Sequence, residues 1–431
     1  MKGKSLQQSL AEENSSTDAG QQNLAKLRNL VPESPFQHFR WITQMSSEAV
    51  ETWKSYFLNR IRAQNSSNVA PVAKQKMRPG AQPGAQPGAQ PAGQNSAKSD
   101  AQQDNNPAMD ASILSSLKNI GRDFYIAEFF EPISSTQLLK SAFPRWICPI
   151  EHQWPTNPLA ERFVERAAQG VVDKLGCSWS DLQVLSATPQ LRRVAIGIKG
   201  RIIQIRNEKK SETIAAESAH SQAEILIAFI HPKGLLAGRS NSRLHLGSAY
   251  VGGLGFLNSA PQEEVRASRA SGKINEVLGL LELVQLTSKN FPTWLELGAA
   301  PGGMTQELVN WGAQVSAVDP ANLNHAVRQH PKVRHIQINA NEIKDASEYS
   351  AILCDMNGPA IISAEIVARL ASTLRCGGLI VHTLKEVSFN ELSQTLRFVE
   401  NTFKQNGIEV LAIKHLFHNR KELTLIAVKH A

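Results

Sequence analysis

The chain has 431 residues, of which 42% are hydrophobic, and a formal net charge of +8 at pH 7. It is long enough for two or three domains of about 150 residues each. It contains no apolar run of about 18 residues, and its polar first 22 residues lack an apolar segment, so we expect neither a membrane span nor a secretory signal. The chain has no C-x-x-C pair, which favours reduced thiols in a cytoplasmic protein and no metal site; its cysteines are Cys148, Cys177, Cys354 and Cys376.

Residues 1–110 are predicted to form a disordered tail and linker. Residues 64–107 are of low complexity, with three copies of Pro-Gly-Ala-Gln, and cannot bury enough apolar surface to fold. Residues 45–62 hold apolar side chains at helical spacing: Val50, Trp53, Tyr56, Phe57 and Ile61. This segment is either a helix that docks on a partner or a membrane surface, or a marginal helix in a flexible tail. We favour the second interpretation.

Residues 111–260 are predicted to form an α+β region. Residues 159–175 have helical periodicity. Several segments have the composition of strands: Asp123–Phe130, Leu191–Ile198, Arg201–Ile205 and Glu224–Ile230.

Positive charge is concentrated in residues 143–260. This segment has 14 Lys and Arg against 9 Asp and Glu, whereas residues 261–431 have 17 of each. The division suits a neutral catalytic domain whose polyanionic substrate is held by an accessory region. The candidate RNA-binding residues are Arg192, Arg193, Arg201, Arg239 and Arg243. An ordinary solvated basic surface is the alternative.

From residue 261 onward, strands and helices alternate. A helix over residues 263–284 comes first, and the last two strands are joined by a short turn. This pattern predicts an α/β, Rossmann-like sheet of seven strands with the last one reversed. The predicted strands lie near Thr293–Leu297, Gln314–Asp319, Arg334–Ile338, Ala351–Met356, Leu379–Leu384, Glu409–Leu416 and Leu423–Lys429.

A glycine-rich turn follows the first of these strands. Gly298 and the run Ala300-Pro301-Gly302-Gly303 separate it from a helix that begins near Thr305. The spacing is neither G-x-G-x-x-G nor a P-loop, which disfavours a phosphate cradle. The next strand ends in Asp319, where a carboxylate suits a ribose diol. Together the turn and the acid indicate S-adenosylmethionine as the cofactor.

Charged residues fall at one predicted edge of the sheet. Asp355 ends the fourth strand and Lys385 ends the fifth, while Glu422 begins the reversed strand. Lys273 lies on the helix before the first strand. Because ligands bind at the carboxyl ends of the parallel strands, we expect these side chains to converge there.

Five motifs mark residues 268–422: Ser268-Arg-Ala-x-x-Lys273-x-x-Glu276, Leu297-Gly-Ala-Ala-Pro-Gly-Gly-x-Thr305, Cys354-Asp-Met356, Lys385 and His418-x-Arg-x-Glu422. They resemble the FtsJ-related ribose 2'-O-methyltransferases, and most closely the RlmM type. The resemblance implies a THUMP-like α+β RNA-binding region at 111–260 and a methyltransferase domain at 261–431 that modifies 23S ribosomal RNA.

The resemblance also implies residue roles. The catalytic tetrad would be Lys273, Asp355, Lys385 and Glu422. The cofactor site would comprise Ser268, Gly298, Ala300, Pro301, Gly302, Gly303, Met304, Asp319, Asn339 and Asp355. The chain departs from the family in having Met304 where Trp is usual and Asn339 where Asp is common. Residues 111–142 are too short for the domain that precedes the THUMP part in the family.

We therefore predict a monomeric, cytoplasmic ribosomal RNA 2'-O-methyltransferase with no metal and no membrane partner. The ribose hydroxyl must lose its proton in or near the transition state, and Lys385 is the expected base. A catalytically inactive RNA-binding or ribosome-assembly factor is the main alternative. A methyltransferase of proteins or small molecules would leave the tetrad and the basic region unexplained.

Overall fold

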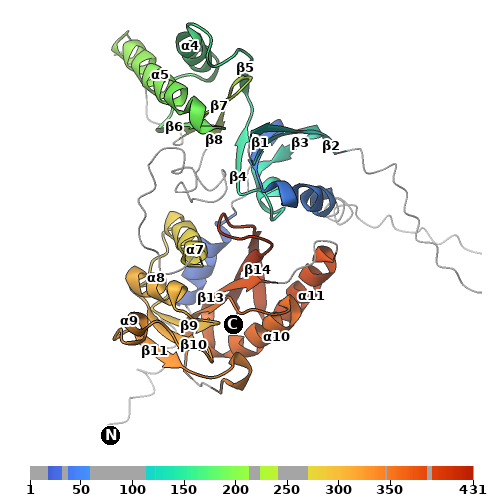
Figure 1. Ribbon diagram of the computed structural model, residues 1–431, viewed down its shortest axis with the longest axis vertical. Coiled ribbons are helices and arrows are strands. Elements are labelled where there is room, and N and C mark those ends of the chain that lie inside the picture. Colours follow the sequence, from blue (N-terminus) through green and yellow to red (C-terminus); the bar gives the residue numbers. More distant parts are fainter. Residues whose placement is uncertain are drawn as a thin grey trace, which may run out of the picture.

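The computed structural model describes residues 18–31, 37–58, 113–121, 123–212, 224–240, 270–344, 347–385 and 391–430. Seven strands form one sheet in the order β11-β10-β9-β12-β13-β15-β14 (Figure 1). Neighbouring strands run parallel except at β15, which is antiparallel to both β13 and β14. The predicted α/β sheet with its reversed last strand is confirmed. Its strands are β9 (Thr293–Leu297), β10 (Gln314–Val318), β11 (Val333–Ile336), β12 (Tyr349–Cys354), β13 (Leu374–Leu384), β14 (Ile408–Lys414) and β15 (Leu423–Lys429).

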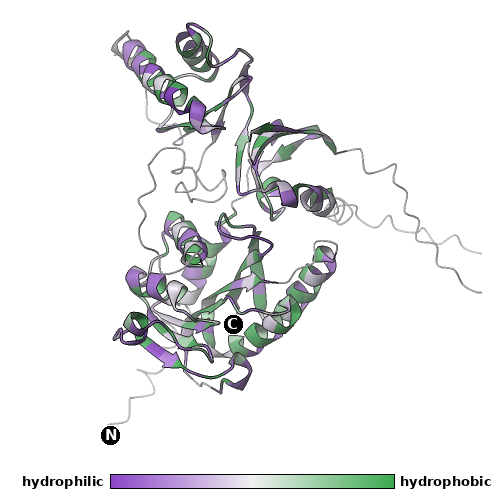
Figure 2. Ribbon diagram, in the orientation of Figure 1, coloured by the Kyte–Doolittle hydropathy of each residue, from purple (hydrophilic) through white to green (hydrophobic). Residues whose placement is uncertain are grey.

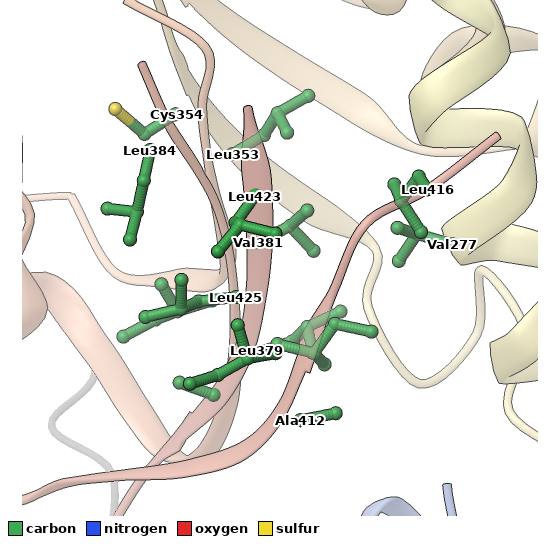
Figure 3. Close-up of a cluster of buried hydrophobic side chains, with 14 of the residues drawn as sticks. Val277, Leu353, Cys354, Leu379, Val381, Leu384, Ala412, Leu416, Leu423 and Leu425 are labelled. Carbon is green, nitrogen blue, oxygen red and sulfur yellow. The ribbon is translucent and has the colours of Figure 1, made fainter. Parts of the chain in front are cut away.

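Helices cover this sheet on both faces, so its central strands are largely buried and mostly apolar. All residues of β12 are buried, and Figure 3 shows Leu353, Val381 and Leu425 as buried side chains of the neighbouring strands β12, β13 and β15. In the last long helix the buried residues recur every three or four positions, as an amphipathic helix requires. The helices are α7 (Ser271–Leu283), α8 (Gly303–Trp311), α9 (His325–Arg328), α10 (Ala360–Leu370) and α11 (Leu392–Gln405). The helix predicted for 263–284 is present over Ser271–Leu283, and residues 263–269 lie outside the described part.

Chain order places the glycine turn at the centre of the sheet. The chain runs outward from β9 through β10 to β11, then crosses back to β12 on the other side of β9. The strand order therefore reverses between β9 and β12. Ligands of open α/β sheets bind at such a switch point, outside the carboxyl ends of the strands.

A second folded unit, the N-terminal module, consists of residues 37–58 and 113–149. Its antiparallel sheet has the order β2-β3-β1-β4, and residues 50–58 form a helix. A short helix, α3 (Ser135–Leu139), follows the longest strand and begins with a capping box at Ser134. The strands are β1 (Gln37–Gln44), β2 (Leu114–Gly121), β3 (Phe124–Ser134) and β4 (Trp146–Pro149).

The N-terminal module corrects the expectation of a disordered tail over 1–110. Residues 18–28 are helical and residues 37–58 are integral to the fold. Trp53 and Phe57 are 0% and 1% exposed, and the Trp53 indole donates a hydrogen bond to Ser141 Oγ at 2.9 Å. The apolar face of residues 45–58 therefore packs inside the protein instead of lying in a flexible tail or docking on a partner, and Ile61 lies outside the described part. The low-complexity residues lie outside the described part.

Two other expectations change with it. Residues 111–142 are not an incomplete domain, because β1 inserts between β3 and β4 and completes their sheet. The helix at 18–28 packs on the C-terminal part of the chain, where Asn23 Oδ1 accepts a hydrogen bond from Asn290 Nδ2 at 2.9 Å. Leu27 is fully buried there.

The middle module, residues 151–240, has a sheet in the order β5-β8-β7-β6 beside two helices. The predicted helix at 159–175 and strand at 224–230 are confirmed, in an α+β arrangement; THUMP-like identity stays a prediction. The elements are β5 (His152–Trp154), α4 (Phe163–Leu175), β6 (Asp181–Ser186), α5 (Arg192–Glu212), β7 (Ile225–His231) and β8 (Gly234–Ser240). Phe124 of β3 packs on Phe229 of β7, with ring centroids 4.7 Å apart, and joins this module to the N-terminal one.

The strands predicted at 191–198 and 201–205 are wrong, because both segments lie in or beside the single helix α5. Their β-branched residues favoured strands, but burial follows helical spacing at Ala195, Ile198, Ile202 and Ile205. Ile196 and Ile203 are instead 61% and 39% exposed. Hydrophilic and hydrophobic residues accordingly interleave along α5 in Figure 2.

Among the described residues, no helix is long and apolar enough to cross a membrane.

Candidate active site

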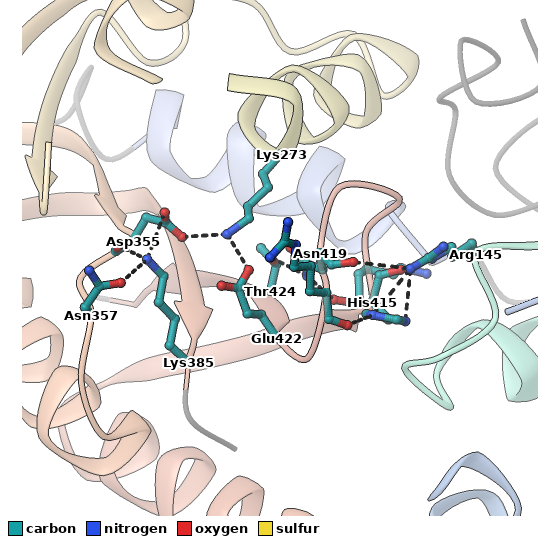
Figure 4. Close-up of polar contacts among 11 residues, drawn as sticks. Arg145, Lys273, Asp355, Asn357, Lys385, His415, Asn419, Glu422 and Thr424 are labelled. Carbon is teal, nitrogen blue, oxygen red and sulfur yellow. Dashed lines mark hydrogen bonds and ion pairs between the residues drawn. The ribbon is translucent and has the colours of Figure 1, made fainter. Parts of the chain in front are cut away.

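The four predicted tetrad side chains form a continuous chain of ion pairs (Figure 4). Lys273 Nζ lies 3.1 Å from Asp355 Oδ1 and also pairs with Glu422 Oε2. Lys385 Nζ lies 3.1 Å from Asp355 Oδ2. Asp355 thus bridges the two lysines, and each charge has a partner of the opposite sign. The side chains are 10–24% exposed, so solvent screens these pairs less than surface pairs.

Sheet topology accounts for the convergence. Asp355 follows β12, Lys385 follows β13 and Glu422 precedes β15. Because β15 is antiparallel to β13, its start lies at the edge where β13 ends. Lys273 reaches this edge from the first turn of α7. The structure brings together all four residues chosen by position; their catalytic roles stay predictions.

Asn357 is a further member of the cluster that the sequence analysis missed. Lys385 Nζ donates to Asn357 Oδ1 at 3.0 Å and also to the backbone carbonyl of Asp355. These bonds fix the lysine beside the carboxylate. The signal was visible in the sequence, because Asn357 stands two residues beyond Asp355 at a productive strand end.

The glycine turn lies next to this cluster. Gly298 has φ +78°, and a Cβ there would lie 2.8 Å from the Cα of Met356. Only glycine therefore lets the end of β9 pass the residues that follow β12. Gly302, with φ +104°, is the N-cap of α8, whose first residue is Gly303. The turn leaves bare backbone beside a helix N-terminus, as a bound ligand requires.

Asp319 connects the turn to the next strand. Its carboxylate accepts hydrogen bonds from the backbone N–H of Ala300 at 3.0 Å and of Ala321 at 2.8 Å. Pro301 is fixed from the same side, because its carbonyl accepts from the N–H of Asn324 at 2.9 Å. The acid and the turn are therefore adjacent, as the predicted cofactor site requires.

The remaining predicted cofactor residues differ in position. Met304 is 4% exposed and packs in the main hydrophobic core. Asn339 is exposed after β11, where its Nδ2 donates to Glu342 Oε1 at 3.0 Å. Ser268 lies outside the described residues.

Comparison with known proteins gives a family match for the C-terminal part of the chain. The family model described as "FtsJ-like methyltransferase" matches residues 266–426. This part of the chain is therefore similar to the FtsJ-related methyltransferases. We refer to the matched residues as the FtsJ-like domain.

Curated relatives support an RlmM-type relationship. "Ribosomal RNA large subunit methyltransferase M" of Shewanella sp. (strain ANA-3) is 28% identical over 233 residues, which cover 50% of this chain and 61% of the relative. The protein of the same name from Shewanella amazonensis is 33% identical over 144 residues, or 30% of this chain and 38% of the relative. The chain thus spans less than two thirds of the length of these relatives. The solved structure of TrmN from Thermus thermophilus covers 90% of this chain and 99% of its own, at 9% identity and a TM-score of 0.30.

A buried acid in the FtsJ-like domain links the strand before the glycine turn to the helix after it. Glu296 in β9 is 2% exposed, and its Oε2 accepts a hydrogen bond from Thr305 Oγ1 of α8 at 2.7 Å. Desolvation raises the pKa of Glu296 to about 8, the Thr305 bond opposes the shift, and Asp355 and Asp319 reinforce it. The sequence analysis assigned no role to Glu296.

The β14–β15 loop, residues 415–422, carries Glu422 and is held from two sides. On one side, Glu276 Oε2 accepts a hydrogen bond from Phe417 N at 2.8 Å. Gly272 admits the loop, because a Cβ there would lie 2.5 Å from the His418 ring. Glu276 belongs to a motif noted in the sequence, but no role had been assigned to it.

Arg145 of the N-terminal module holds the other side of the β14–β15 loop. Its Nε donates to the His415 carbonyl at 3.3 Å, and its Nη2 donates to the Asn419 carbonyl at 3.4 Å. The guanidinium also lies 5.5 Å from the centre of the Phe417 ring, a cation–π arrangement. The sequence offered no signal for a contact across 270 residues.

The arginines predicted to bind RNA do not form one free patch. Arg192, Arg193 and Arg201 lie on α5, at the far end of the molecule from the methyltransferase sheet (Figure 1), and Arg239 lies on β8. Arg201 pairs with Glu165 at 2.6 Å and Glu208 at 3.4 Å. Arg239 pairs with Glu151 at 2.9 Å. Arg193 is exposed, and Arg243 lies outside the described residues.

No group of three or more His, Cys, Asp or Glu side chains in the described part of the chain is arranged to hold a metal ion.

Proposed function

We propose that this protein is an S-adenosylmethionine-dependent ribose 2'-O-methyltransferase of large-subunit ribosomal RNA. The ion-pair chain of Lys273, Asp355, Lys385 and Glu422 beside the glycine turn is the observation that carries the proposal. The relatives are named for methylation of the same class of RNA, and 23S RNA is the expected substrate.

The residues around the glycine turn suit the cofactor. Gly298 and Gly302 allow the turn its positive-φ conformation next to the N-terminus of α8, and Asp319 offers carboxylate oxygens to a ribose diol. Asn339 is exposed one strand further along and can accept a hydrogen bond from an adenine amino group. S-adenosylmethionine, when bound, supplies an electrophilic methyl group.

The protein's own residues must then position a ribose hydroxyl and accept its proton. Lys385 is the base in this proposal, held at the rim by Asp355 and Asn357. Lys273, placed between two carboxylates, orients Asp355 and adds positive charge near the hydroxyl oxygen as it loses its proton. Alignment of the hydroxyl contributes a large part of the rate.

The test is methyl transfer from tritiated S-adenosylmethionine to ribosomal RNA of a strain that lacks the protein, followed by nuclease digestion. We expect label on a 2'-O-methylated nucleoside. Label on a base would refute the ribose assignment. Absence of transfer to any RNA, with cofactor binding intact by calorimetry, would favour the RNA-binding assembly factor.

A further inference from the structure

A cleft of about 700 Å³ separates the tetrad from the N-terminal module. One wall belongs to the FtsJ-like domain and includes Lys385, Glu422, Arg420 and Lys421. The facing wall includes Ser46, Glu48 and Arg145 of the N-terminal module. The volume lies within the range of about 300–1,000 Å³ that is usual for ligand sites and is large enough for a nucleotide.

The two walls differ in charge. Arg420 and Lys421 are exposed on the β14–β15 loop, on the side of Lys385. On the opposite side, the Arg145 guanidinium is already bonded to the backbone carbonyls of His415 and Asn419. The Glu48 carboxylate on that side is exposed and would repel a phosphate placed beside it. A carboxylate can, however, accept hydrogen bonds from the N–H groups of a nucleobase edge, and a serine hydroxyl can donate or accept them. The cleft therefore favours phosphate at the loop and base at the Ser46–Glu48 wall.

The N-terminal wall is fixed relative to the tetrad. His415 N donates to the Ala142 carbonyl at 2.8 Å, and Lys414 Nζ donates to the Leu139 carbonyl at 3.3 Å. Arg145 holds the same loop at the His415 and Asn419 carbonyls, ahead of the tetrad glutamate in sequence. The distance between Glu48 and Glu422 is thus set by direct contacts that do not involve RNA.

We propose that the target nucleotide occupies this cleft, with its ribose at the tetrad and its base against Ser46 and Glu48. The inference rests on the proposed function. It makes the N-terminal module part of the substrate site, with Arg145 as a positioning residue that acts through the β14–β15 loop.

Glu48→Ala in the full chain tests the proposal, with Glu51→Ala as the matched control. Glu51 lies one helical turn further on, with its side chain 82% exposed, and pairs with Lys54. On undermethylated ribosomal RNA, Glu48→Ala should lower kcat/KM by about 10- to 100-fold, mainly through KM. Glu48→Gln, which keeps a carbonyl acceptor, should recover most of this loss, and Glu51→Ala should behave as the wild type. Equal kcat/KM in the two alanine variants would overturn the proposal.

Ultraviolet crosslinking of the wild-type protein to the same RNA supplies a second readout that does not need turnover. We expect nucleobase crosslinks in the peptide that contains residues 46–48, lost in the presence of excess unlabelled target RNA. Crosslinks there without methyl transfer would refute the proposed function but support the cleft as an RNA site. Methyl transfer with crosslinks only elsewhere would refute the base contact and leave the enzyme assignment intact.

Discussion

The tetrad residues and the arginines of the middle module were both predicted from the sequence to be functional, but the fold arranges them differently. Four tetrad residues from four separate elements meet in one chain of ion pairs. The arginines are spread over α5 and β8, and Arg201 and Arg239 are paired with carboxylates of their own module. The tetrad residues thus meet at one place, whereas the described arginines do not, and two of them are paired within their own module.

The difference lies in the kind of argument that selected them. Asp355, Lys385 and Glu422 were chosen because a parallel sheet brings its strand ends to one edge. The arginines were chosen by counting charge, and a count of charge cannot reveal which carboxylates the fold places beside each cation. Position in a regular topology is therefore the stronger guide.

The largest effect is expected from removing a lysine of the tetrad. Lys385→Ala should lower the rate of methyl transfer by about 10²–10⁴-fold while sparing binding of cofactor and RNA, because the lost amine handles the proton of the hydroxyl. Lys385→Arg should not restore activity, since guanidinium stays protonated at neutral pH. Lys404→Ala, in the exposed last turn of α11, is the matched control. Tritium transfer measures the rate, and full activity in Lys385→Ala would exclude a catalytic role for the tetrad.

A second change tests the region that the sequence analysis placed in a disordered tail. Trp53 is fully buried, stacks on Phe57 with centroids 5.3 Å apart and bonds to Ser141. Trp53→Ala should destabilise the N-terminal module by about 3–5 kcal/mol. Urea unfolding with hydrogen exchange of the β1 amides measures the loss. Lys54→Ala, on the same helix, should cost far less, and equal stability of the two variants would restore the tail interpretation.

Sequence alone predicted the FtsJ-like domain well because its strands are buried runs separated by helices. The N-terminal module could not be predicted, because its two pieces, 37–58 and 113–149, flank a low-complexity segment and pair across it. In α5, β-branched residues obscured the helical spacing of burial. The Arg145 contact and the Ser46–Glu48 wall depend on how two folded units meet, which no local pattern records.

The buried acid beneath the turn should produce a pH effect of intermediate size. The pKa of Glu296 is about 8 in the folded state, against an ordinary value of 4.5. Between these values the folded state binds more protons than the unfolded state, so its free energy of unfolding falls as pH rises. The slope approaches about 1.4 kcal/mol per pH unit. Glu296→Gln keeps an acceptor for Thr305 and should remove this slope between pH 5 and 8. Thermal unfolding midpoints of both proteins measure it, and parallel curves would exclude a protonated Glu296.

A smaller effect is expected at the cofactor. Asp319→Ala should weaken S-adenosylmethionine by about 1.5–3 kcal/mol, the range for hydrogen bonds to a charged group. Part of the loss would come from the turn itself, because Ala300 N–H loses its acceptor. Calorimetry measures the affinity, with Asp173→Ala on the exposed surface of α4 as the control. Unchanged affinity in Asp319→Ala would remove this acid from the cofactor site.

The smallest effect sharpens the comparison within one helix. Arg193 and Arg201 carry the same charge on α5, but Arg193 is exposed whereas Arg201 pairs with Glu165 and Glu208. If α5 contacts the RNA backbone, Arg193→Gln should reduce the slope of log K against log salt by about one unit, the loss of one released counterion. Arg201→Gln should change the slope less, because its carboxylate partners already offset its charge. Filter binding of ribosomal RNA across a salt series distinguishes the two variants. Equal and unchanged slopes would assign both arginines to ordinary surface and leave the N-terminal module and the β14–β15 loop as the RNA contacts to test.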